Sequence, residues 1–179
     1  ADAAGVAGHG RCSSSAPSAL SGVRVVELGG SLSGPTCGML LAAFGADVVK
    51  VEAPRRGDEL RHWRVMDERT TTSLWFRQLA RNKRCVTANM RTARGRDLVR
   101  RLVCAPPPRR CDVLVENFRP GRLEQWQLAP HHLRRAAPHL VVARISAHGQ
   151  SGPRAAQPGY ASVCEAIGGL RYVTGAGAE

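Results

Sequence analysis

Residues 23–52, VRVVELGGSLSGPTCGMLLAAFGADVVKVE, decide the fold of this chain. The run at 23–28 is rich in β-branched residues, and a glycine-rich turn follows at 29–34. A small apolar helix is expected over 35–44, because it begins with proline and is followed by a glycine. A second strand follows at 47–52. The stretch therefore predicts a β-α-β unit with parallel strands.

The same alternation continues through the rest of the chain. Further strands are expected at 84–89, 112–116 and 140–145, and helices over 92–104, 121–128, 130–137 and 160–170. Five strands separated by helices predict an α/β fold, a Rossmann-like, doubly wound and mainly parallel sheet.

Two stretches do not follow the alternation. Residues 53–80 are predicted to be an irregular functional loop, anchored by Trp63, Trp75 and Phe76. Residues 1–19 are small and polar, with one arginine and one acid, and we interpret them as a leader or a disordered tail. This composition loosely resembles a mitochondrial transit peptide and lacks the apolar core of a secretory signal.

Length and composition fit one ordinary globular domain, with 179 residues of which 43% are hydrophobic and 22% charged. The net charge is +12, and of the 26 basic residues only Lys50 and Lys83 are lysines. The basic stretch 91–110 contains apolar pairs at helical spacing and no aromatic residue, which favours a solvated helix face over a nucleic-acid site. No apolar run approaches the roughly 18 residues of a membrane-spanning helix.

The six cysteines show no C-x-x-C pair and no histidine at zinc-ligand spacing, so we expect no metal site. Isolated reduced cysteines are the favoured interpretation, although Cys104 and Cys111 flank a proline-rich loop across which they could meet.

Ligands of open α/β sheets bind beyond the carboxyl ends of the strands. The glycine-rich turn opens a helix, whose free N–H groups favour a phosphate or carboxylate. Glu52, at the end of the second strand, occupies the place of a ribose-binding acid. This position suggests the hypothesis of a nicotinamide or flavin oxidoreductase. However, the glycines at 29, 30, 34 and 38 do not make G-x-G-x-x-G, and no P-loop is present.

A set of motifs in fixed order gives a more specific indication. Together they resemble CoA-transferase family III, the CaiB/BaiF family, over roughly residues 20–175. The motifs are LSGVRVVEL (20–28), SGP (33–35), LAAFGADVVKVE (41–52), GD (57–58), RNKR (81–84), DVLVENFRPG (112–121), HGQSGP (148–153), PGY (158–160) and GGLRYVTG (168–175).

The resemblance implies transfer of CoA from an acyl-CoA to a free carboxylic acid, through a mixed anhydride and an aspartyl-CoA thioester. It places the nucleophilic aspartate in a Gly-Asp segment beyond Glu179. We therefore expect this chain to be a fragment without a catalytic residue, and we assign neither Asp58 nor Asp112 that role. It further implies an interlocked homodimer and is closest in character to the succinyl-CoA-dependent, mitochondrial branch.

The resemblance also implies which residues contact CoA, as a substrate and not as a tightly bound cofactor. Arg91 suits a phosphate, Asn117 suits the adenine or pantetheine amides, and Phe118 suits the adenine ring. The complete predicted set is Leu32, Ser33, Ala53, Arg55, Ala88, Arg91, Asn117, Phe118 and Tyr160. Residues 20–179 are then the CoA-binding part of an incomplete large domain.

The chain departs from the family pattern in two places. Ala161 stands where relatives commonly carry an acid, and residues 105–111 look like a proline-rich insertion. Tyr160 stands where the related racemases carry a catalytic histidine, which favours transfer over racemisation.

Four hypotheses remain open. In order of preference they are a CoA-transferase, a catalytically inactive CoA- or nucleotide-binding module, a nicotinamide oxidoreductase and a nucleic-acid-binding protein.

Overall fold

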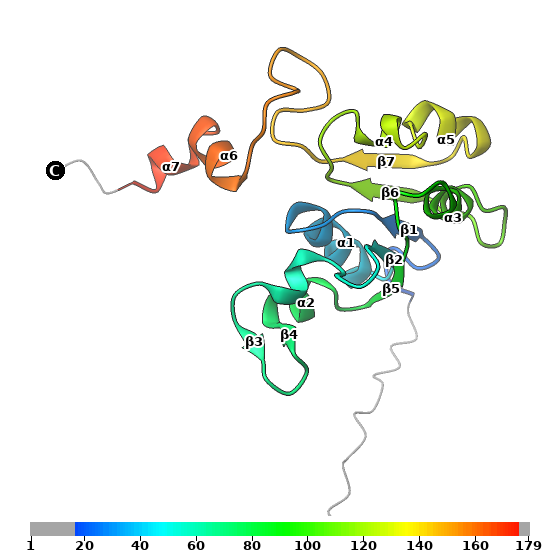
Figure 1. Ribbon diagram of the computed structural model, residues 1–179, viewed down its shortest axis with the longest axis horizontal. Helices are drawn as coiled ribbons and strands as arrows, with labels where there is room; N and C mark the ends of the chain where they lie inside the picture. The colour runs from blue at the N-terminus through cyan, green and yellow to red at the C-terminus, as the bar shows by residue number, and fades with distance from the viewer. Residues whose placement is uncertain (1–16, 176–179) are drawn as a thin grey trace, which may run out of the picture.

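Five parallel strands form the central sheet of the computed structural model, which describes residues 17–175 (Figure 1). The strand order is β5-β2-β1-β6-β7, so the chain reverses its direction of travel across the sheet between β1 and β6. This is the doubly wound arrangement that the sequence predicts. The strands are β1 (Arg24–Glu27), β2 (Asp47–Glu52), β5 (Lys83–Thr87), β6 (Val113–Glu116) and β7 (Val141–Arg144).

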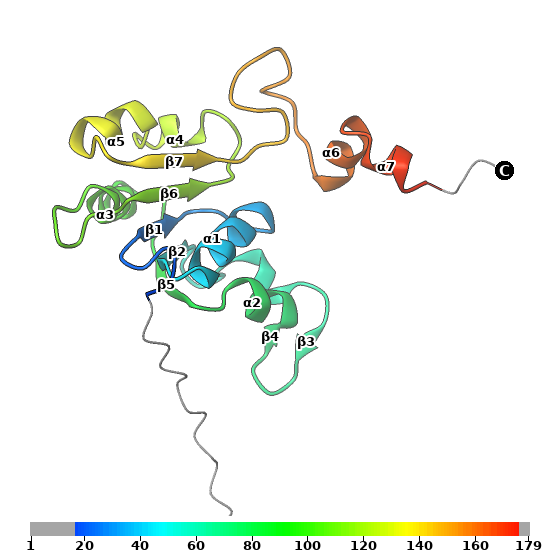
Figure 2. The same cartoon turned by 180° about the vertical axis from the view of Figure 1, so that it is seen from behind.

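Helices cover both faces of the sheet, as seen from the front and from behind (Figure 1, Figure 2). On one face, α1 (Ser33–Ala43) packs on Val25, Val48 and Val115. The opposite face is covered by three helices: α3 (Ala93–Val103), α4 (Arg122–Gln125) and α5 (Pro130–Ala136). Helix α1 begins two residues earlier than predicted, inside the glycine-rich turn.

Helix α3 shows why a strongly arginine-bearing segment can still fold against the sheet. Its cap is Thr92, whose Oγ1 accepts a hydrogen bond from the Gly95 amide at 3.1 Å. Val99 and Val103, four residues apart, are buried in the main core. Burying each such side chain contributes about 1.5–3 kcal/mol. The arginines between them face away from the core, which agrees with the predicted solvated face.

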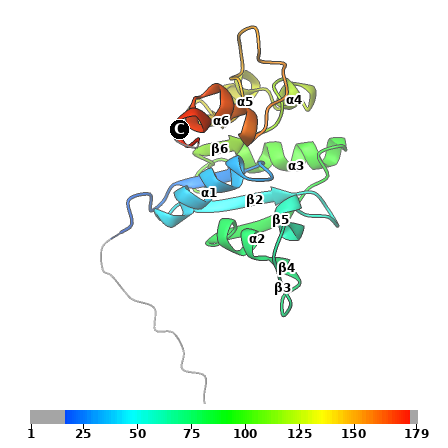
Figure 3. The ribbon, with the colours of Figure 1, turned by 90° about the vertical axis from the view of Figure 1, so that its left-hand side faces the viewer.

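Residues 53–80 are more regular than predicted. They form a short 3-10 helix η1 (Glu59–His62), an antiparallel hairpin of β3 (Met66–Asp67) and β4 (Thr72–Ser73), and helix α2 (Leu74–Leu79). Helix α2 contacts α1 and η1, and strand β4 of the hairpin contacts α2 and η1 (Figure 3). These elements were missed because each is too short to show an apolar period.

The three aromatic anchors predicted in this segment have different outcomes. Phe76 is buried with Leu60 and Leu79, and Trp63 is half-buried against them. Trp75 is 39% exposed, so its prediction as an anchor is wrong: it stands on the outer side of α2.

The carboxyl-terminal helices α6 (Ala161–Ile167) and α7 (Leu170–Val173) lie apart from the sheet and bury no residue (Figure 1). The helix expected from residue 160 ends at Gly168–Gly169, the pair of glycines expected to close it, and Gly169 has a φ of 79°. Within residues 17–175, no helix is both long and apolar enough to cross a bilayer.

Candidate functional site

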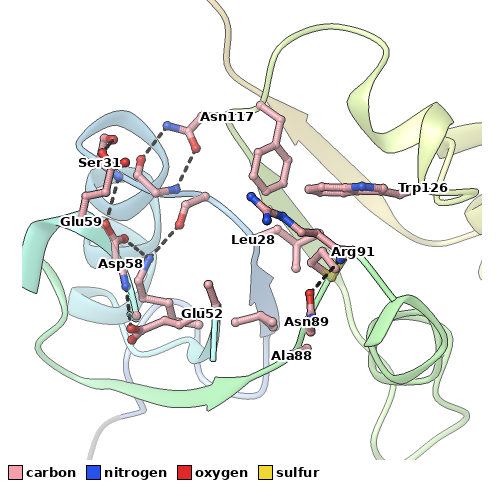
Figure 4. A pocket seen from close by; sticks show the side chains of 18 residues that line it. Leu28, Ser31, Glu52, Asp58, Glu59, Ala88, Asn89, Arg91, Asn117 and Trp126 are labelled. Carbon is pink, nitrogen blue, oxygen red and sulfur yellow. Dashed lines mark hydrogen bonds and ion pairs between the residues drawn. The ribbon is translucent and has the colours of Figure 1, made fainter. Parts of the chain in front are cut away.

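A cavity of 410 Å³ lies at the carboxyl ends of β1, β2, β5 and β6 (Figure 4). This is the position where the reversal of strand order opens a crevice in a doubly wound sheet. The volume falls in the usual range for small-molecule sites. Five of the nine predicted residues line it, namely Ala53, Ala88, Arg91, Asn117 and Phe118.

The turn after β1 is held by a side chain from the turn after β6. Asn117 accepts a hydrogen bond from the Gly30 amide at 2.9 Å and donates to the Gly30 carbonyl at 2.8 Å. A β-carbon on Gly29 would lie 2.8 Å from the Gly34 α-carbon, so the turn closes only with glycines. The pocket lining thus includes Asn117, but its amide group is already bonded within the turn.

The remaining predicted residues lie outside the cavity. Ser33 accepts a hydrogen bond from Asn117 at 2.9 Å, so it helps to hold Asn117 against the turn. Leu32 packs against the cluster of Leu60 and Phe76. Arg55 is exposed beside the pocket, and Tyr160 is 80% exposed at the start of α6.

One wall of the pocket is aromatic. The rings of Phe118 and Trp126 meet edge to face with centroids 5.0 Å apart. Arg91 extends its guanidinium into the pocket above Leu28, and no carboxylate of residues 17–175 pairs with it (Figure 4). An aromatic wall beside a free guanidinium suits a ligand that combines a ring with a phosphate. Trp126 was missed because its contact with Phe118 depends on how α4 packs, which the expected helix over 121–128 does not specify.

The aromatic wall is fixed by an ion-pair network beneath it. Glu116 accepts a hydrogen bond from the Phe118 amide at 2.7 Å and pairs with Arg144, also at 2.7 Å. Arg144 pairs in addition with Glu124 on α4 at 2.8 Å. The hydrogen bond from Arg144 holds the pKa of Glu124 below its ordinary value.

On the opposite wall, the carboxylate of Glu52 accepts hydrogen bonds from other residues of the protein. Arg61 donates to both carboxylate oxygens of Glu52, at 2.7 and 2.8 Å, and the Asp58 amide donates at 2.9 Å. Burial alone would raise the pKa of Glu52, but these hydrogen bonds outweigh it and hold the pKa below 4.5. A ribose would find no free carboxylate here, which counts against the oxidoreductase hypothesis.

A second charged cluster lies deeper in the same wall and was not predicted. Glu27, Lys50 and Asp58 have side chains at most 2% exposed, and Lys50 pairs with both acids. Lys83 pairs with Glu27 at 2.6 Å. Asp58 thus has structural partners, and Asp112 likewise accepts the Arg24 amide at 2.9 Å and pairs with Arg110 at 3.0 Å.

The backbone of the pocket edge adopts unusual conformations. Ser31, in the first turn, and Arg55, in the segment after β2, have φ values of 59° and 68°. Non-glycine residues rarely adopt this left-handed region, and such strain gathers at functional sites. The left-handed backbone of these two turns is therefore maintained by contacts with the surrounding residues.

The parallel sheet, the crevice and the cationic, aromatic pocket define a Rossmann-like ligand-binding protein. Comparison with known families makes this specific, because the profile of CoA-transferase family III matches residues 20–179. The chain belongs to CoA-transferase family III.

Individual relatives agree with this assignment. The chain is 46% identical over 159 residues to a succinyl-CoA–D-citramalate CoA-transferase of Chloroflexus aurantiacus, covering 89% of this chain and 38% of the relative. It is 37% identical over 164 residues to a mouse succinyl-CoA:glutarate CoA-transferase, covering 92% of this chain and 36% of the relative. The chain thus spans less than two fifths of the length of these curated relatives.

Solved structures show the same architecture. A CaiB/BaiF family protein from Brucella suis superimposes with a TM-score of 0.78 at 38% identity, covering 87% of this chain and 40% of that structure.

Proposed function

We propose that this chain is the CoA-binding part, residues 20–179, of an enzyme that transfers CoA from an acyl-CoA to a free carboxylic acid. The observation that carries the proposal is the pocket at the carboxyl ends of the strands, with Arg91 free and Phe118 against Trp126, in a chain of this family. Succinyl-CoA is the proposed donor, because two relatives are named as succinyl-CoA-dependent CoA-transferases.

In this proposal CoA lies along the crevice as a substrate. The Arg91 guanidinium pairs with a phosphate, and the Phe118 ring packs on the adenine. Asn117 keeps the Gly30 turn open beside the ligand by its two hydrogen bonds. Leu32, Ser33, Ala53, Arg55, Ala88 and Tyr160 complete the proposed CoA-contacting set.

The proposed chemistry needs a carboxylate nucleophile, which splits the exchange between two acids into easier steps. We propose that an aspartate in a Gly-Asp segment following Thr174-Gly175 in the complete enzyme forms the aspartyl-CoA thioester. Residues 1–179 alone are then inactive. A homodimer of the complete enzyme and a mitochondrial location are proposed as well, the latter supported only by the composition of residues 1–19.

The test of the binding step is calorimetric titration of this chain with CoA and with NADH. We expect CoA to bind and Arg91→Ala to weaken binding about tenfold or more, because a hydrogen bond to a charged group is lost. The control is Arg94→Ala, which removes an exposed arginine of α3 outside the pocket. Binding of NADH without CoA would contradict the proposal.

The test of the transfer step uses the product of the complete reading frame, with succinate and other carboxylic acids as acceptors and mass spectrometry of the enzyme-bound thioester. A frame without a Gly-Asp segment after position 175, or a product without turnover, leaves an inactive CoA-binding module as the function.

A further inference from the structure

The two lysines of the chain occupy one buried cluster. All other basic residues among the 26 are arginines, yet Lys50 and Lys83 both lie against Glu27, with side chains 1% and 0% exposed. Asp58 is the fourth member, 2.6 Å from Lys50. Two buried ammonium groups thus face two buried carboxylates, which balances the charge of the lysine cluster, as we call these four residues.

The Lys50 ammonium has a partner in each of three directions. It pairs with Glu27 at 2.7 Å and with Asp58 at 2.6 Å, and it donates to the Gly29 carbonyl at 2.7 Å. The contacts with Glu27 and Gly29 are hydrogen bonds, and the contact with Asp58 is an ion pair. Its neighbour Lys83 bonds Glu27 at 2.6 Å and the Pro35 carbonyl at 2.7 Å.

Two partners of Lys50, Gly29 and Asp58, line the pocket. Gly29 is in the turn after β1, and Asp58 accepts from the Ser31 amide of that turn at 3.2 Å. Asp58 also accepts from the Leu60 amide at 3.0 Å, which caps η1. The Lys50 ammonium therefore joins two neighbouring edges of the cavity, the Gly29–Ser31 turn and the residues around Asp58.

Helix α1 packs closely on the Glu27 and Lys83 side of the cluster. A β-carbon added to Gly38 of α1 would lie 1.9 Å from Glu27 Oε2 and 3.1 Å from Lys83 Nζ, so the helix backbone closes over the cluster. A planar guanidinium spreads its donors in a fork and cannot direct three of them from one point. An arginine at either lysine position would therefore direct its donors differently from the ammonium.

We propose that Lys50 and Lys83 are positioning residues: the Lys50 ammonium joins the Gly29–Ser31 turn to the segment around Asp58 for CoA, and the Lys83 ammonium holds Glu27, the partner that both lysines share. This inference rests on the proposed function for the identity of the ligand. Removing a buried ammonium leaves buried carboxylates unpaired, and replacing it by a guanidinium keeps the charge but not the geometry.

The test compares Lys50→Arg and Lys83→Arg with the matched control Arg84→Lys. Arg84 neighbours Lys83 on β5, but its side chain is exposed and pairs with Asp47. A lysine at this position can therefore form the same ion pair. For each folded variant, CoA affinity is measured by calorimetry and amide hydrogen exchange by mass spectrometry. We expect both lysine variants to bind CoA at least about tenfold more weakly, with faster exchange in peptides covering 29–32 and 57–60. The control should match the wild type.

Asp58→Asn serves as a second variant in case the lysine variants do not fold, because it keeps the shape of the cluster and removes one charge. It should accelerate exchange in the same two peptides. Wild-type affinity and exchange in the variants would overturn the inference, and so would weaker CoA binding without faster exchange at 29–32. If the wild type binds no CoA, the proposed function fails, while the exchange data still decide whether the lysines position the turn.

Discussion

Asn117 connects two turns that are 87 residues apart in the sequence. Its side-chain nitrogen is the atom that donates hydrogen bonds to the first turn. Asn117→Asp keeps the acceptor for the Gly30 amide but loses the donor to the Gly30 carbonyl and to Ser33. We expect a loss of about 1–3 kcal/mol in the free energy of unfolding, measured in urea. The control is Asn89→Asp, because the side-chain oxygen of Asn89 only accepts, from the Arg91 amide at 3.1 Å. An equal loss in both variants would contradict this role of Asn117.

The ionisation of Glu52 makes the stability of the protein depend on pH. Its folded-state pKa lies below 4.5, so the folded state holds the carboxylate more strongly than the unfolded chain does. This stabilisation is present above about pH 4.5 and is lost as the pH falls through the folded-state pKa. We expect the melting temperature of Glu52→Gln to change less between pH 6 and pH 3 than that of the wild type. Glu68→Gln, at an exposed position, should follow the wild type.

At the scale of elements, the capping of α3 is open to a simple measurement. Thr92→Ala removes the hydroxyl that accepts the Gly95 amide, and we expect the free energy of unfolding to fall by about 1 kcal/mol. Thr92→Ser keeps the hydroxyl and should retain most of the stability. Equal losses in the two variants would show that the methyl group, and not the cap, is responsible.

The parallel sheet was predictable because each strand carries its own local signal. The run at 23–28 is rich in β-branched residues, and glycines mark the ends of the turn and helix after it. The short elements within 53–80 carry no such signal, since a two-residue strand shows no alternation. Their formation depends on contacts with residues of α1, such as Met39, that only the folded chain brings together.

The pocket was predictable in position but not in its internal bonding. Phe118 was predicted from the motif at 112–121 and Arg91 from its place after the third strand in the family resemblance, and both line the cavity. The pairing of Glu27 with Lys50 and Lys83 depends on the register of three strands, which no local pattern specifies. Trp126 was missed for the same kind of reason, since its contact with Phe118 arises from the packing of α4.

For the whole molecule, α6 and α7 present the least covered surface. Ile167, Leu170 and Val173 are 57%, 53% and 75% exposed, and neither helix buries a residue. Apolar patches of this kind favour association. We expect the 179-residue chain to self-associate as its concentration rises, and Ile167→Glu to reduce this, as measured by light scattering after size exclusion. A wild-type chain that stays monomeric at all concentrations would contradict the expectation.

The burial of both lysines also has a consequence for covalent chemistry. Since Lys50 and Lys83 are the only lysines of the sequence, the folded chain offers no exposed ε-amine to an acylating reagent. Labelling with an amine-reactive ester should then modify these side chains only when the lysine cluster opens, so its rate reports that opening. The same seclusion keeps both amines from reacting with the activated thioesters that the proposed function brings to the pocket.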